Sequence, residues 1–181
     1  EVRFEQRLLV YSKQLVADAL TRFPETPAAG RAVLLRAAAE RASGNFLLFF
    51  ADLQRFIANF PNSPLIPAAH SERGLMSYEQ GKFQESLRHF QDAAFSSDSD
   101  FIVRNDSVYH WLAADASFWA AVSTAKLGRL DEAIPRFEET ARLYPQARFA
   151  DDALFAAGQL HDIARRPAEA MSHYRNVREK Y

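Results

Sequence analysis

Small and aromatic residues recur at fixed distances after several of the chain's glycines. Gly81 is followed by a small residue five places on and by Phe90 nine places on, and Gly128 leads to Phe137 in the same way. Positions four residues apart share one face of an α-helix. Glycine readily adopts the left-handed conformation that ends a helix. The pattern predicts a tight turn at each glycine, between two helices, with Arg165 at the place of the glycine in a further copy.

A second phrase, an aromatic residue followed by proline and then by alanine-rich sequence, recurs at Phe23-Pro24, Phe60-Pro61 and Tyr144-Pro145. Proline lacks an N–H and disfavours helical angles at the residue before it, so it ends a helix. A Thr or Ser just after the proline can accept hydrogen bonds from the free amides of the next helix. These phrases predict hinges between helical hairpins.

The two phrases together predict an all-α chain of about nine helices, over residues 2–22, 29–43, 45–59, 66–80, 82–95, 107–127, 130–143, 148–164 and 167–180. The helices pair into one array over 1–181, with a partial hairpin at 1–23 and hairpins at about 28–60, 66–96, 107–144 and 148–180. Ser96–Asn105 breaks the period. We interpret it either as a loop or as an extension of the next helix.

This arrangement resembles the tetratricopeptide repeat, whose unit has small residues and an aromatic at set places. The matching positions are Gly74, Gly81, Ser86, Phe90 and Ala93 in one unit, Ala121, Gly128, Ala133, Phe137 and Pro145 in a second, and Gly158, Ala170 and Tyr174 in a third. The unit from Gly30 to Pro61 departs from the pattern, because Phe49 replaces the small residue and Leu53 the aromatic. The resemblance implies a right-handed superhelical solenoid that holds other proteins.

In the resembled fold the first helix of each hairpin lines a concave groove. Carried over to this chain, the groove positions are Leu34, Ala38, Ser71, Leu75, Tyr78, Phe118, Val122, Ala125, Phe155, Gln159 and Asp162. The family's lysine and asparagine clamp for a C-terminal carboxylate is missing from these positions, and their apolar character favours an apolar or aromatic peptide segment. Packing between helices is the alternative role for each of them.

A group of four aromatic residues follows the interruption of the period: Tyr109, Trp111, Phe118 and Trp119. Trp and Tyr are common anchors of protein interfaces. The group either forms a contact specific to one partner or buries the inserted segment. With the groove positions it gives the predicted partner-binding residues, which are Leu34, Leu75, Tyr78, Trp111, Phe118, Trp119, Val122, Phe155 and Gln159.

Composition indicates which kinds of partner and which cellular location to expect. The 22 basic and 23 acidic residues give a net charge of -1, so a nucleic-acid partner is not expected. Phe46–Ala51, the longest apolar run, is too short to span a bilayer. The chain lacks cysteine and begins with Glu1, which we interpret as the start of a processed or excised segment. The sequence of the hinges and the period of 37 residues are most similar to those of bacterial periplasmic and outer-membrane-associated repeat proteins, such as outer-membrane assembly lipoproteins and the Tol–Pal coordinator. This predicts a cell-envelope location, with the cytoplasm as the alternative.

Catalytic and metal chemistry find little support in the pattern. None of the five histidines has another three or four residues away, so no helix presents two histidines to a metal, and Asp98 and Asp100 lack the rest of a calcium loop. The carboxylates that could serve a helical-repeat enzyme are Glu72, Glu79, Asp115 and Asp162. We therefore predict a protein-binding scaffold, not an enzyme, without metal or cofactor. A structural spacer or self-association segment of a larger protein is the main alternative.

Overall fold

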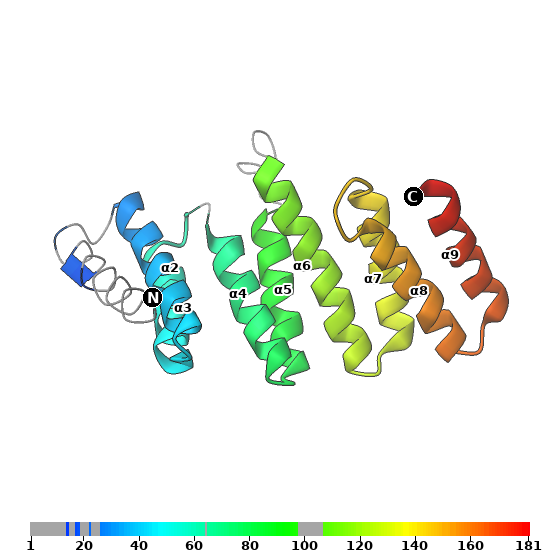
Figure 1. The fold of residues 1–181 in the computed structure, drawn as a ribbon, viewed down its shortest axis with the longest axis horizontal. Helices are drawn as coiled ribbons and strands as arrows, with labels where there is room; N and C mark the ends of the chain where they lie inside the picture. Colours follow the sequence, from blue (N-terminus) through cyan, green and yellow to red (C-terminus); the bar gives the residue numbers. More distant parts are fainter. Residues whose placement is uncertain (1–13, 15–16, 19–21, 23–25, 64, 98–106) are drawn as a thin grey trace, which may run out of the picture. The chain divides into compact units, whose positions relative to one another are not determined.

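The computed structural model describes residues 14, 17–18, 22, 26–63, 65–97 and 107–181, and of residues 27, 31, 95–97 and 107–111 it describes the backbone alone. These ranges contain eight full helices and no strand, which confirms the all-α class (Figure 1). The helices are α2 (Pro27–Ala42), α3 (Phe46–Asn59), α4 (Ile66–Glu79), α5 (Phe83–Ser97), α6 (Ser107–Lys126), α7 (Leu130–Leu143), α8 (Ala150–Ile163) and α9 (Pro167–Lys180). The first predicted helix, 2–22, lies mostly outside the described residues. Within this range residues 14, 17, 18 and 22 are described, and they are helical.

The chain divides into two compact units, Glu1–Ala69 and His70–Tyr181, with the boundary inside α4. In the second unit each helix from α5 to α9 packs against the next one in the sequence, and α2 packs against α3 in the first. Figure 1 shows α5 to α9 running side by side in alternating directions. The single array over the whole chain stays a prediction.

The turns inside the hairpins have the predicted left-handed backbone. Gly44, Gly81 and Gly128 have φ angles of 74°, 72° and 76°. Arg165, which stands where a further glycine was expected, has a φ of 59°. The position therefore requires the turn even where the residue is not glycine.

The hinges also follow the prediction, with one difference in length. The Thr26 hydroxyl accepts a hydrogen bond from the Ala29 amide at 3.2 Å and caps α2. At the last hinge, the Ala147 amide donates to the Tyr144 carbonyl at 3.0 Å, in a turn that continues past residue 148. For this reason α8 begins at Ala150, two residues later than predicted.

Contacts between a small residue and an aromatic ring hold the hairpins of the second unit together. A Cβ atom added to Gly74 would lie 2.9 Å from the Phe90 ring, and one added to Gly158 would lie 2.6 Å from the Tyr174 ring. Neither distance leaves room for a methyl group, so the two helices approach closely only because these residues are glycines.

The first unit makes the same kind of contact between glycine and an aromatic ring, but farther along the helix from the turn of the hairpin. Gly30 faces Phe56, to whose ring an added Cβ would lie at 3.0 Å. Gly30 precedes the turn glycine Gly44 by 14 residues, whereas Gly74 precedes Gly81 by seven. The Phe49 that departs from the repeat pattern is buried. This hairpin departs from the sequence pattern because its tight contact is displaced toward the far end of the helices.

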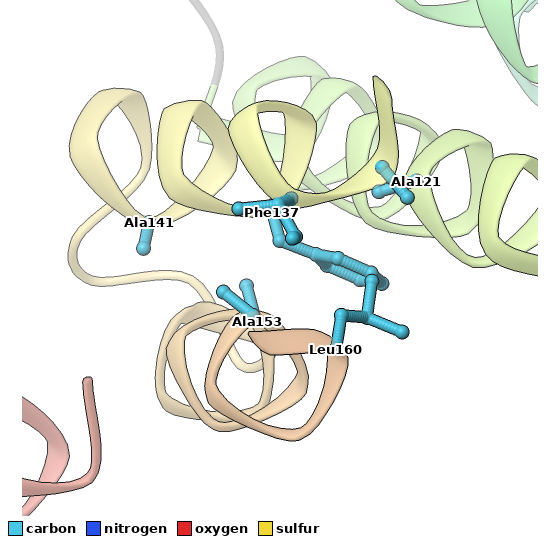
Figure 2. Close-up of a cluster of buried hydrophobic side chains, with 8 residues drawn as sticks. Ala121, Phe137, Ala141, Ala153 and Leu160 are labelled. Carbon is cyan, nitrogen blue, oxygen red and sulfur yellow. The ribbon is translucent and has the colours of Figure 1, made fainter. Parts of the chain in front are cut away.

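The core of the second unit lies between consecutive helices. One cluster consists of Ala121 from α6, Ala133, Ile134, Phe137 and Ala141 from α7, and Ala153, Ala157 and Leu160 from α8. Figure 2 shows the Phe137 side chain directed from α7 toward Leu160 of α8. Small residues surround the one large ring, so it fills the space that they leave.

Candidate functional site

The first helices of the hairpins in the second unit carry the predicted groove positions at the surface. Counted back from the turn residue, these positions stand ten, six and three residues before it in α4, α6 and α8. The positions on α4 and α6 are half-buried, and those on α8 are exposed. They are Ser71, Leu75 and Tyr78 on α4, Phe118, Val122 and Ala125 on α6, and Phe155, Gln159 and Asp162 on α8. None of the nine is fully buried. The repeat pattern thus separated this partly exposed face from the core.

Four half-buried aromatic side chains meet on this face. The Tyr78 and Trp119 rings lie edge to face with centroids 5.2 Å apart, and Trp119 meets Phe118 at 5.8 Å. Phe118 in turn stacks on Phe149 at 4.5 Å, with the two planes only 10° apart. These contacts join α4, α6 and the residue before α8. We call Tyr78, Phe118, Trp119 and Phe149 the aromatic cluster.

The aromatic cluster contains two residues, Tyr78 and Phe149, that were not among the four aromatic residues expected after the interruption of the period. Sequence reasoning missed Phe149, whose only local signal is its place after the Tyr144-Pro145 hinge. The side chains of Tyr109 and Trp111 lie outside the described part, so the expected role of Trp111 stays a prediction.

Arg148 holds this hinge against α6. Its Nε donates to Asp115 Oδ1 at 3.1 Å, and its guanidinium carbon lies 4.5 Å from the centre of the Phe149 ring. The hydrogen bond to the Asp115 carboxylate raises the pKa of Arg148 above its ordinary value. Asp115 therefore has a structural partner here.

The most exposed aromatic ring of the face is Phe155 on α8. It is 47% exposed, and its ring lies 5.4 Å from that of Tyr174 on α9. The Tyr174 hydroxyl donates to Asp162 Oδ2 at 2.6 Å, which raises the pKa of Tyr174. Gln159, one turn after Phe155, is exposed as well. The α8 part of the face therefore offers an apolar ring beside polar groups.

In the first unit, α2 carries the corresponding positions. Leu34 is half-buried and Ala38 is exposed. Between them, Arg36 Nε donates to Asp52 Oδ2 at 2.7 Å and ties α2 to α3. Asp52 is buried, and its carboxylate is compensated by this guanidinium.

Comparison with known proteins agrees with this arrangement. The family model of the tetratricopeptide repeat matches residues 51–101, 104–148 and 120–181, more than half of the chain. The chain belongs to the tetratricopeptide repeat family. The family match starts inside α3, which fits the displaced glycine contact of the first hairpin. No curated protein matches the chain in sequence.

Solved structures similar to this tetratricopeptide repeat protein share its fold at low sequence identity. One is MamA, 17% identical, with a TM-score of 0.69 over 93% of this chain and 85% of that one. A second is the repeat structure of a putative kinesin light chain from Podospora anserina, 15% identical, with a TM-score of 0.72 over 97% and 86%. A third is PilF of Pseudomonas aeruginosa, 15% identical, with a TM-score of 0.66 over 98% and 71%. These similarities show the fold, that of tetratricopeptide repeats, and this fold is consistent with a protein-binding scaffold.

The tetratricopeptide repeats also bring histidines together from different helices. One group is His70, His89 and Asp92, and the other is Glu138, His161 and His173. Within each group one ligand atom of every residue lies within 4.8 Å of the others. The search for histidine pairs along single helices missed both groups, because each contact joins separate helices.

Asp115 and Asp162, two of the four candidate carboxylates, are engaged with Arg148 and Tyr174 respectively. Among the described residues, no helix combines the length and the apolar character that a bilayer crossing requires.

Proposed function

We propose that this tetratricopeptide repeat protein is a scaffold that binds an apolar or aromatic segment of a partner protein on the face formed by α4, α6 and α8. The observation that carries the proposal is Phe155, a large ring that stays 47% exposed on the first helix of its hairpin. Exposed aromatic side chains are common anchors of protein interfaces.

The polarity of the face indicates how a segment would bind. The half-buried rings of the aromatic cluster present edges and faces for apolar side chains. Gln159 is exposed one turn after Phe155 on α8 and can exchange hydrogen bonds with a peptide backbone. An extended or helical segment with apolar side chains at regular spacing fits this combination.

We further propose that the partner belongs to a bacterial cell-envelope assembly. The support is the sequence motif of the hinges, Pro-x-Ser/Thr-Pro, at Pro24–Pro27 and Pro61–Pro64, together with the period of 37 residues. Both resemble periplasmic and outer-membrane-associated members of the family.

Affinity capture tests both parts of the proposal. The unaltered chain, Phe155→Asp and Met171→Asp would each be used to capture proteins from separate envelope and cytosolic extracts. Met171 is the matched control, because it is an apolar side chain 60% exposed on α9, the second helix of the same hairpin. Circular dichroism would first establish that both variants are folded.

We expect a protein from the envelope extract that the unaltered chain and Met171→Asp retain and that Phe155→Asp loses. Equal retention by all three would contradict binding on this face. A partner found only in the cytosolic extract would contradict the envelope location.

Self-association is the second candidate function, and the last hairpin favours it. Ile163 and Met171 are exposed by 65% and 60% at α8 and α9. Apolar side chains exposed together are typical of surfaces that contact another protein. Sedimentation at several concentrations would separate the two functions, since a mass that rises with concentration and returns to that of a monomer in Met171→Asp would favour self-association.

A further inference from the structure

We propose that Glu138, His161 and His173 form a binding site for a divalent transition-metal ion of the Zn²⁺ type. The three residues come from three consecutive helices, α7, α8 and α9. Their ligand atoms lie within 4.8 Å of one another. Two imidazoles and one carboxylate are a ligand set that Zn²⁺ accepts in proteins, with a fourth position left for water or for a partner's side chain.

The distances require only small side-chain movements. His173 Nε2 lies 3.0 Å from Glu138 Oε1, and the His161 and His173 rings are 5.1 Å apart and nearly parallel. Bonds of 2.0–2.2 Å to a tetrahedral ion place neighbouring ligand atoms about 3.4 Å apart. One pair already meets this spacing, and rotations that move the remaining atoms by about one ångström complete the set.

Burial supplies an independent reason for a ligand at this point. His161 is only 8% exposed, and its Nδ1 is buried with no hydrogen-bond partner among the described residues. The Nδ1 of His173 also has no partner among the described residues, but His173 faces Glu138 through Nε2, so burial points to a ligand at His161 alone. A buried ring nitrogen without a partner destabilises the fold, and an ion that engaged such a nitrogen would remove part of this cost.

The Glu138 carboxylate can be reached from solvent. Glu138 has a side chain 44% exposed and lines a surface hollow of about 410 Å³ between α7, α8 and α9. Arg142, one turn after Glu138, pairs with Glu139 at 3.5 Å. The hollow therefore gives an ion access from solvent to the Glu138 carboxylate, one of the three proposed ligands.

The group of His70, His89 and Asp92 is less suited to a metal ion than the group of Glu138, His161 and His173. His89 and His173 stand at the same place in their hairpins, eight residues after Gly81 and after Arg165. Around His89, however, burial and the charges of Arg73 and Arg88 lower the imidazole pKa to about 4. Burial is the largest cause, and a buried place beside two arginine charges disfavours a metal cation as it disfavours a proton.

Titration with Zn²⁺ and Co²⁺ tests the site, with Glu138→Gln and Asp92→Asn as matched variants. Each removes one carboxylate charge from one histidine group at a partly exposed position, so both variants are expected to fold. We expect calorimetry to find one ion bound per chain and Co²⁺ to give the visible absorption of a site with nitrogen ligands. The Glu138→Gln affinity should fall roughly tenfold or more, and the Asp92→Asn affinity should be unchanged.

A second measurement uses the same two variants and detects binding through stability. Zn²⁺ should raise the melting temperature of the unaltered chain and of Asp92→Asn, because the ion binds only the folded state, and should raise it less in Glu138→Gln. Absence of binding at micromolar Zn²⁺ would overturn the proposal. Binding that Asp92→Asn loses and Glu138→Gln keeps would overturn it as well, since the ion would then belong to the other group.

Discussion

At the scale of single residues, the turn between α8 and α9 stores strain that the other turns avoid. Arg165 has a φ of 59°, in the left-handed region where Gly44, Gly81 and Gly128 also lie. For a residue with a Cβ atom this conformation costs about 1–2 kcal/mol. Glycine avoids that cost, but it loses about 0.5–1 kcal/mol more conformational entropy on folding.

Substitution at this turn should therefore stabilise the protein. We expect Arg165→Gly to raise the free energy of unfolding by about 0.5 kcal/mol, the difference between the two effects. Gly128→Ala should lower it by about 0.5 kcal/mol, because the same two effects then act with the opposite sign. Urea unfolding of both variants measures these changes. A less stable Arg165→Gly would show that the arginine side chain stabilises the turn by a contact of its own.

At the scale of helices, the boundaries could be predicted where proline and glycine determine them. The turns at Gly81 and Gly128 and the end of α3 before Pro61 needed only the backbone properties of these residues. The start of α8 could not be predicted in this way. The ring of Phe149 stacks on Phe118, 31 residues earlier, and no local pattern contains that contact.

Phe137 is the strongest test of the helix register. It is 2% exposed and lies in the core between α6, α7 and α8. We expect Phe137→Ala to lower the free energy of unfolding by about 3–5 kcal/mol, since the cavity among small residues would not be refilled. Phe155→Ala is the control, because its ring is 47% exposed, and it should cost less than about 1 kcal/mol. Thermal melting that is unchanged in Phe137→Ala would refute the register.

At the scale of the whole molecule, the repeats could be predicted and the contacts between them only in part. The nine groove positions of the second unit are all partly or fully exposed, because their spacing follows the helix period. The two histidine groups escaped prediction, because residues such as His161 and His173 meet across helices. The displaced contact of Gly30 with Phe56 escaped it for the same reason.

The buried His89 should make the protein sensitive to mild acid. Its pKa in the folded state is lowered to about 4 by burial, by Arg73 and Arg88 and by His70, against an ordinary value of 6.5. Between these values the unfolded chain binds a proton that the folded chain does not, so stability falls as the pH falls through this window. The loss should approach about 3 kcal/mol at the lower end, and no effect of His89 is expected above pH 6.5.

Chemical unfolding between pH 7 and 5 measures this loss, in a range above most carboxylate titrations. His89→Gln should have a shallower dependence of stability on pH than the unaltered chain. An equal dependence in both would show that another group causes the acid sensitivity.

The packing of each helix on the next one along the chain also determines how the protein reaches its fold. In the second unit α5 to α9 pack in sequence order, so each step of assembly closes only a short loop. Chains whose contacts are this local have a low contact order, and low contact order goes with fast folding. Any hairpin of the unit can serve as the nucleus on which its neighbours assemble. The search for the native state is therefore a sequence of short local steps, and the chain can begin it before its last helix has been synthesised.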